Sequence, residues 1–169
     1  MKKIGFSTIC AFCLLSSACF AESPQKIGEY NDWSAFFFRE GKNIVCYMAS
    51  SPQKSEGKYT KRGDVYMAIT HRPADKSFDV VNFVAGYTYK NSAPVVVKIG
   101  KDSINDFFVD GDKAWTMNAA TDKKLVEAMK KGERLIIEGT SSKGTLTKDS
   151  YSLKGFTAAY RAISSKCRR

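Results

Sequence analysis

The sequence is poor in the residues that build common catalytic and metal sites. His71 is the one histidine among 169 residues, and it lies in the segment Ile-Thr-His-Arg-Pro. A Ser-His-Asp or Cys-His catalytic device depends on a histidine, and no G-x-S-x-G motif accompanies this one. A zinc site needs three or four nitrogen or sulfur ligands, which one histidine and two distant cysteines do not supply. We therefore expect a structural histidine at a strand end and no enzymatic activity.

Nucleotide and calcium motifs are also missing. The chain has neither a Walker loop nor a G-x-G-x-x-G segment. Asp106, Asp110 and Asp112 lie close together, but they lack the alternating spacing and the final glutamate of a calcium loop. Asp110-Gly111 between two apolar runs predicts a hairpin turn instead. We expect no catalytic, cofactor-binding or metal-binding residues.

The apolar run at the start of the chain is too short to cross a membrane as a helix. It extends from Ile4 to Leu15, follows Lys2-Lys3 and precedes small residues at Cys19 and Ala21. This pattern is typical of a secretory signal peptide. We expect residues 1–21 to be that peptide and residues 22–169 to form one exported domain, in the periplasm, at the outer membrane or secreted. Lipoprotein anchoring at Cys19 is the alternative.

Cysteine is scarce beyond that segment. Cys46 and Cys167 remain, 121 positions apart. An even number of cysteines in an exported chain favours a disulfide. A reactive thiol is the alternative, but neither cysteine lies in a C-x-x-C motif or close to the histidine in sequence.

Short β-branched and aromatic runs separated by turn residues dominate the rest of the chain. Such runs are typical of an all-β sandwich or barrel. Phe36-Phe37-Phe38 cannot all face one side of a strand, so the strand holding them has apolar groups on both faces. Residues 50–63 are polar and basic, which predicts a long loop. The expected strands are residues 30–39, 44–49, 64–72, 78–85, 94–99, 104–109, 114–117, 135–139 and 145–153.

Two segments have helical periodicity instead. Residues 121–131 begin with Thr121 as a candidate cap, have an apolar face and end in Lys-Lys-Gly. Residues 156–165 place apolar side chains on one helical face. The members of that face are Phe156, Tyr160, Ile163 and Cys167. We expect the C-terminal helix to pack on the sheets and to direct Cys167 toward Cys46.

Positive charge exceeds negative charge. The chain has 27 Lys and Arg against 17 Asp and Glu, a net charge of +10. Such an excess favours anionic surfaces through long-range attraction, and a solvated basic surface without a partner is the alternative. Nucleic acid is not expected, because an exported chain rarely meets it and no nucleic-acid-binding motif occurs. The candidate contacts are Lys54, Lys58, Lys61, Arg62, Lys123, Lys124, Lys130, Lys131 and Arg134.

An ordered series of short blocks resembles one bacterial family. The blocks include Asp32-Trp33, Val45-Cys46-Tyr47, residues 69–73, Gly111-Asp-Lys-Ala-Trp115 and residues 150–160. Together they resemble the invasion-associated locus B (IalB) family of exported bacterial proteins, over residues 29–167.

The resemblance implies an immunoglobulin-like β-sandwich in the envelope or secreted. It also implies a role in contact with or entry into host cells, erythrocytes especially, and it carries no catalytic or ligand residues. The alternative is a periplasmic accessory domain that engages an envelope protein or anionic lipid. The expected partner is therefore a protein or an anionic envelope or host surface.

Overall fold

The computed structural model describes residues 23–168, and its strands form two antiparallel sheets. The expected signal peptide and Cys19 lie outside the described residues. One sheet has seven strands, in the order β1 (Gln25–Tyr30), β2 (Trp33–Glu40), β3 (Asn43–Ser50), β5 (Tyr66–Arg72), β6 (Ser77–Val84), β10 (Lys113–Thr116) and β9 (Phe107–Asp110). The other has five, in the order β4 (Lys54–Gly57), β12 (Leu146–Ser152), β11 (Arg134–Thr140), β7 (Val96–Ile99) and β8 (Asp102–Ile104).

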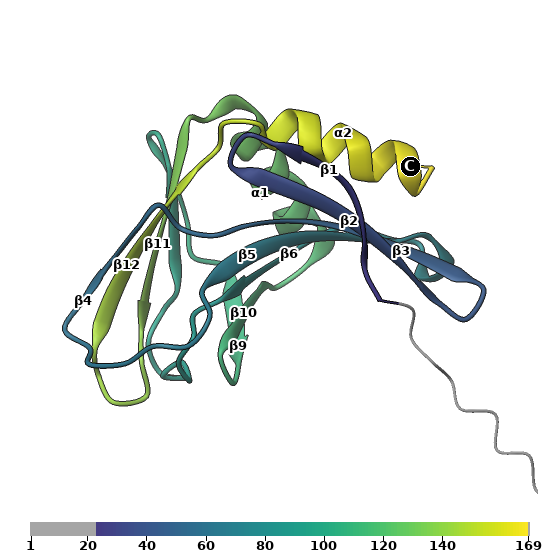
Figure 1. Cartoon of the computed structure of the whole chain (residues 1–169). Coiled ribbons are helices and arrows are strands. Elements are labelled where there is room, and N and C mark those ends of the chain that lie inside the picture. Colours follow the sequence, from purple (N-terminus) through teal and green to yellow (C-terminus); the bar gives the residue numbers. More distant parts are fainter. Residues whose placement is uncertain (1–22, 169) are drawn as a thin grey trace, which may run out of the picture.

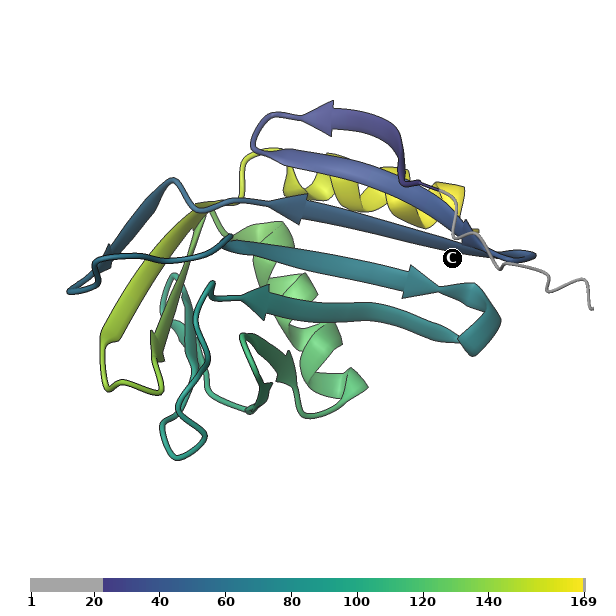
Figure 2. The same cartoon turned by 60° about the horizontal axis from the view of Figure 1, so that its bottom comes forward.

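Two helices complete the fold on one face of the seven-stranded sheet. Helix α2 (Phe156–Lys166) lies along β1, β2 and β3, and helix α1 (Ala119–Lys131) packs on β6 and β10 (Figure 1). A short 3₁₀ turn, Pro73–Asp75, joins β5 to β6. The five-stranded sheet stands at a steep angle beside the helices (Figure 2). One face of the larger sheet is therefore shared between the helices and the smaller sheet.

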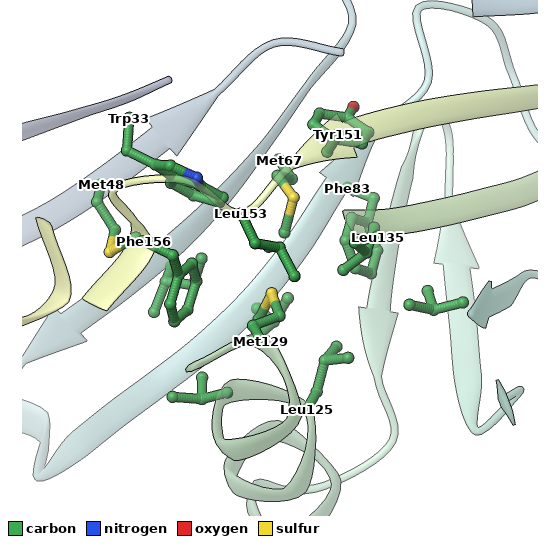
Figure 3. Close-up of a cluster of buried hydrophobic side chains, with 14 of the residues drawn as sticks. Trp33, Met48, Met67, Phe83, Leu125, Met129, Leu135, Tyr151, Leu153 and Phe156 are labelled. Carbon is green, nitrogen blue, oxygen red and sulfur yellow. The ribbon is translucent and has the colours of Figure 1, made fainter. Parts of the chain in front are cut away.

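The core lies between these layers. Trp33 of β2 is 1% exposed; its ring meets Phe156 of α2 edge to face at 5.0 Å, and its Nε1 donates to the Ser152 carbonyl at 3.0 Å. Leu125 of α1 and Leu135 of β11 belong to the same cluster (Figure 3). Both helices and both sheets therefore share one continuous hydrophobic core, as expected of layered β domains.

The mainly β, sandwich-like fold predicted from the sequence is confirmed, and so are both helical segments. The Asp110-Gly111 hairpin also forms: β9 and β10 pair there, and Gly111 has a φ of 58°, in the left-handed region that glycine adopts readily. The Phe36–Phe38 run splits as predicted. Phe37 packs on the core, while Phe36 stacks on Tyr47 on the other face.

Four details of the predicted elements are wrong. Residues 50–63 are not all loop, because β4 forms there as a charged edge strand on β12, without the apolar alternation that marks a strand. Strand β1 was not predicted, and residues 104–109 split between β8 and β9. Helix α1 begins two residues early, because Asn118 rather than Thr121 caps it. No helix within residues 23–168 is long and apolar enough to cross a membrane.

Candidate functional site

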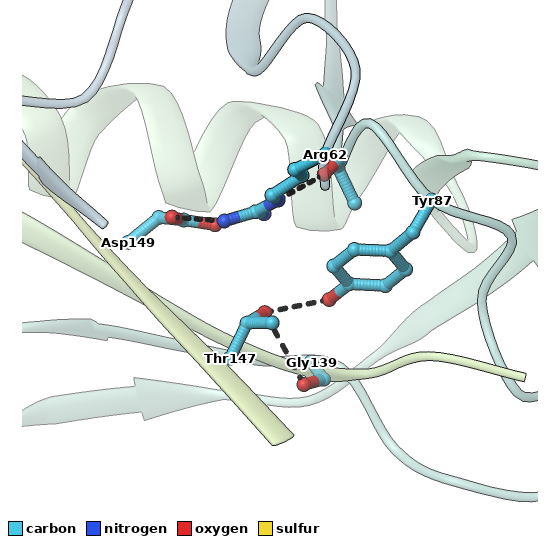
Figure 4. Close-up of polar contacts among 6 residues, drawn as sticks. Arg62, Tyr87, Gly139, Thr147 and Asp149 are labelled. Carbon is cyan, nitrogen blue, oxygen red and sulfur yellow. Dashed lines mark hydrogen bonds and ion pairs between the residues drawn. The ribbon is translucent and has the colours of Figure 1, made fainter. Parts of the chain in front are cut away.

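A buried ion pair fastens the segment after β4 to the smaller sheet. Arg62 Nη1 and Nη2 donate to the two carboxylate oxygens of Asp149, on β12, at 2.7 and 2.6 Å (Figure 4). Arg62 Nε donates to the Ala85 carbonyl at 2.5 Å, just after β6. The two charged side chains are 5% and 6% exposed. This contact, the Arg62 clamp, therefore ties three segments that are distant in sequence.

Two tyrosines flank the clamp. The rings of Tyr59 and Tyr87 lie 5.4 and 5.0 Å from the Arg62 guanidinium carbon, within the range of cation–π attraction. The Tyr87 hydroxyl and Thr147 Oγ1 are hydrogen bonded at 2.7 Å, and Thr147 Oγ1 donates to the Gly139 carbonyl at 3.4 Å (Figure 4). These contacts extend the clamp to the β11–β12 hairpin.

The electrostatics of the clamp keep Arg62 charged. Burial alone would lower the pKa of Arg62, but the hydrogen bonds and charge of Asp149 raise it above its ordinary value. Burial raises the pKa of Tyr87, so its hydroxyl stays protonated near neutral pH. Arg62 is thus a cation already neutralised by Asp149.

A polar cavity of about 340 Å³ opens beside the clamp. One wall is the 58–62 segment and the other is the β11–β12 hairpin, with Tyr87 and Thr88 between them. Twelve residues line it: four are cations and eight carry hydroxyl groups, with no acid and no aliphatic side chain among them. The volume lies at the low end of small-ligand pockets. Carbon atoms of the tyrosine, threonine and lysine side chains make about half of the cavity surface apolar. The lining therefore suits a small amphipathic ligand that carries hydroxyl groups rather than a purely apolar one.

Three cations of the cavity have no acidic partner. Lys58, Lys61 and Lys143 are exposed, and no carboxylate of residues 23–168 lies within ion-pairing distance of them. Their charge faces a cavity whose fourth cation, Arg62, is already paired. The site thus has three free positive charges around a hydroxyl-lined hollow, an arrangement that attracts anions.

Comparison with known families places the chain. The model of the invasion associated locus B (IalB) protein family matches residues 33–164, most of the chain. The chain belongs to the IalB family. No curated protein and no solved structure shows significant similarity to it.

In this IalB-family chain the predicted basic residues between positions 54 and 62 fall into different environments. Lys58 and Lys61 line the cavity, whereas Lys54 pairs with Glu56 on β4 at 2.8 Å. The expectation that Arg62 contacts an external anionic surface is not supported by its position, because Asp149 already binds its buried guanidinium. Burial separates a structural cation from the two lysines beside it in sequence.

The predicted basic residues between positions 123 and 134 lie apart from the cavity. Lys123 and Lys124 are exposed on α1, and Lys130 pairs with Glu127 at 2.6 Å and lies over the Tyr160 ring. Lys131 and Arg134 line a shallow hollow of about 570 Å³ together with Asp102 and Glu133. Mixed charge there makes a weaker anion site than the cavity.

The structure also brings together the two cysteines. Cys46 on β3 and Cys167 at the end of α2 have their Sγ atoms 2.06 Å apart, as the predicted disulfide requires. His71 is fully buried beside them: its Nδ1 accepts from the Asp79 amide, and its Nε2 is 3.1 Å from Ser164 Oγ. This matches the structural histidine expected at a strand end.

Sequence reasoning missed part of the cavity. Lys143 lies in Gly139-Thr-Ser-Ser-Lys-Gly144, where the chain turns from β11 into β12, and the local sequence has turn residues but no anion-binding motif. Nothing local marks Asp149 as the partner of Arg62, 87 residues earlier. No group of three or more His, Cys, Asp or Glu side chains within the described 23–168 range is arranged to hold a metal ion.

Proposed function

We propose that this IalB-family protein is an exported, non-enzymatic binding domain that helps a bacterium contact or enter host cells. Its contact surface is the end of the sandwich that holds the cavity, with Lys58, Lys61 and Lys143 around it. The observation that carries the proposal is the unpaired positive charge at a polar cavity in a chain of the invasion-associated family.

A binding role fits the chemistry of the chain better than catalysis. His71 is buried and hydrogen bonded, so substrate does not reach it. The cavity has hydroxyl groups and cations, but no carboxylate or imidazole side chain lines it to act as a general base. The lysines and hydroxyls around it are suited to recognition, because they supply charge and hydrogen bonds without a proton-transfer pair.

The test combines location with phenotype. A strain that lacks the protein is complemented with the wild type or with Lys58→Gln/Lys61→Gln/Lys143→Gln, and host-cell entry is counted. Protease is then added to intact cells, with a known periplasmic protein as the protected control. We expect cleavage of the protein in intact cells, fewer entries without it, and failure of the triple variant to restore entry.

A different pattern contradicts the proposal. Protection until the outer membrane is permeabilised, together with normal entry by the deletion strain, rules out a role in host contact. That pattern supports a periplasmic accessory domain that engages an envelope protein or anionic lipid. The matched variant Lys123→Gln/Lys124→Gln/Lys131→Gln removes the same charge from α1, so equal loss of entry by both variants rules out the cavity as the contact surface.

A further inference from the structure

We propose that the cavity binds an anionic sugar, a hexose-sized unit that carries a carboxylate, sulfate or phosphate group. The inference rests on the proposed function insofar as the cavity is the contact surface, and it adds the chemical class of the ligand. It starts from the lining, in which hydroxyl-bearing residues and cations account for every side chain.

The hydroxyl groups favour a ligand that is itself rich in hydroxyls. Each Ser, Thr or Tyr hydroxyl both donates and accepts hydrogen bonds. Sugar hydroxyls have the same dual capacity, so donor and acceptor roles adjust on both sides of the contact. The hydroxyls of Tyr87, Thr147 and Ser141 are already hydrogen bonded within the protein. The hydroxyl residues open to a ligand are therefore the exposed ones, Tyr59, Thr60, Thr88 and Ser142. An apolar ligand would bury these groups without a hydrogen-bond partner, which is costly. The lining therefore selects a carbohydrate over a lipid tail or an aliphatic peptide side chain.

The cations require that the sugar be charged. Lys58 and Lys61 come from the wall that follows β4, and Lys143 comes from the hairpin wall. An anionic substituent between the two walls meets positive charge on both sides. The paired Arg62 contributes no free charge, but it holds the first wall in place. The anionic group thus belongs near the rim, where the lysine ammonium groups reach it.

The walls are fixed before any ligand arrives. Within the hairpin, the Thr145 amide donates to Ser141 Oγ at 3.1 Å and the Ser141 amide donates to the Thr145 carbonyl at 2.9 Å. The Ser142 amide donates to the Thr88 carbonyl at 2.7 Å, which attaches the hairpin to the segment that lies between the two walls. The Arg62 clamp does the same for the other wall. Binding therefore costs little ordering of the protein, which favours recognition of a small ligand.

Tyr59 gives the cavity one amphipathic edge. Its side chain is 38% exposed although its ring lies near the Arg62 guanidinium. A tyrosine presents an apolar ring with a polar hydroxyl at its tip and has few rotatable bonds to immobilise. The C–H face of a sugar ring packs on such a surface while its hydroxyls stay hydrogen bonded. The cavity thus pairs an apolar contact with charge and hydroxyls.

The experiment is an NMR titration of the exported protein with four sugars. Sialyllactose and a sulfated heparin disaccharide represent host glycans, glucosamine 6-phosphate represents the phosphorylated sugars of the bacterial surface, and lactose is the neutral control. We expect at least one anionic sugar to bind and to shift the amide signals of residues 58–62, 87–88 and 141–147. The sugar that binds most tightly distinguishes the host source from the bacterial one.

Matched variants test where the sugar binds. Lys58→Gln/Lys61→Gln/Lys143→Gln is expected to weaken binding about tenfold, equivalent to about 1.4 kcal/mol. Lys123→Gln/Lys124→Gln/Lys131→Gln lowers the net charge equally and is expected to change binding less than about twofold. Both variants alter exposed side chains, so circular dichroism should show that they remain folded.

Three results overturn the inference: no sugar binds, lactose binds as tightly as the anionic sugars, or both variants lose binding equally. These results are distinct from failure of the proposed function. If none of the sugars binds but the cavity variant still loses host entry, the anionic-sugar proposal is wrong and the proposed function stands. If the protein binds a sugar but is protected in intact cells and dispensable for entry, the proposed host role is wrong and the sugar site stands.

Discussion

At the residue scale, the Arg62–Asp149 pair acts as a fastening between distant segments. Desolvating two charges costs several kcal/mol per ion, and good hydrogen-bond geometry offsets that cost. Here all three guanidinium nitrogens are used, two on Asp149 and one on the Ala85 carbonyl. Such a pair adds little net stability compared with an apolar replacement. Its consequence is positional, because it sets where Lys58 and Lys61 stand beside the cavity.

Removing one partner of this pair should be far more damaging than removing both. Arg62→Ala leaves Asp149 charged and buried, so we expect a loss of about 3–5 kcal/mol in the free energy of unfolding. The double variant Arg62→Met/Asp149→Leu should unfold at nearly the wild-type urea concentration, because no charge is left unpaired. Urea denaturation followed by tryptophan fluorescence measures both.

The exposed pair of Arg72 with Glu40 provides the control for that measurement. Its side chains are 37% and 44% exposed, so water screens the charges, and Arg72→Ala should change stability far less. Equal losses in Arg62→Ala and Arg72→Ala would contradict a buried, structural role for the clamp.

At the element scale, the two helices are held by different devices. Asn118 precedes α1, and its side-chain oxygen accepts from the Thr121 amide at 3.0 Å. Helix α2 has no side-chain cap, since Gly155 precedes it, but the Cys46–Cys167 contact attaches its C-terminal end to β3. A local hydrogen bond therefore fixes one helix, and a link across 121 residues fixes the other.

Replacing the cap of α1 should have a moderate effect. Asn118→Ala removes the acceptor for the Thr121 amide, and we expect a loss of about 1 kcal/mol in the free energy of unfolding. Asn118→Ser should restore most of it, because serine supplies the same acceptor. Asn118→Asp should restore less, because Asp106 Oδ2 lies 3.4 Å from the side-chain nitrogen of Asn118 and would face a second negative charge there. Thermal unfolding of the wild type and the three variants tests this. If Asn118→Ser is as unstable as Asn118→Ala, capping is not the cause of the loss.

Removing the Cys46–Cys167 disulfide should lower stability more than removing the cap of α1. Cys46→Ala/Cys167→Ala is expected to lower the free energy of unfolding by about 2–5 kcal/mol, because the unfolded chain regains its freedom. Amide hydrogen exchange should accelerate most in α2. Mass spectrometry of the unreduced wild type should find no free thiol, and two free thiols would disprove the disulfide.

At the scale of the whole molecule, local pattern predicts the elements, and long-range contact decides the site. Apolar alternation in Ile44, Cys46 and Met48 is enough to predict β3 and its inner face. The polar strand β4 has no such pattern, because its neighbour β12 rather than its own side chains makes it a strand. The cavity is harder still to predict, since Lys61 and Lys143, 82 residues apart in sequence, line it together only in the folded protein. Family resemblance identified the chain, but it supplied no cavity residues.

The net charge of +10 and the cavity should act on different length scales. Long-range attraction sums over the whole molecule and is screened within about 10 Å at 0.1 M salt and about 3 Å at 1 M salt. We therefore expect the protein to cosediment with phosphatidylglycerol vesicles at low salt and to be released by about 0.5 M salt. The cavity variant and the α1 variant should lose vesicle binding equally, because each removes three charges from the same total.

Sugar binding should separate the same two variants: the cavity variant should lose it and the α1 variant should keep it, since only the lysines at the cavity contact the sugar. Neutral phosphatidylcholine vesicles are the control for attraction that does not depend on charge. Binding to anionic vesicles that persists at about 0.5 M salt would contradict an electrostatic origin. It would point instead to apolar contact through exposed side chains such as Phe108 and Leu146, which are 47% and 67% exposed. The pair of variants thus separates a general attraction to anionic membranes from a specific site on the same basic protein.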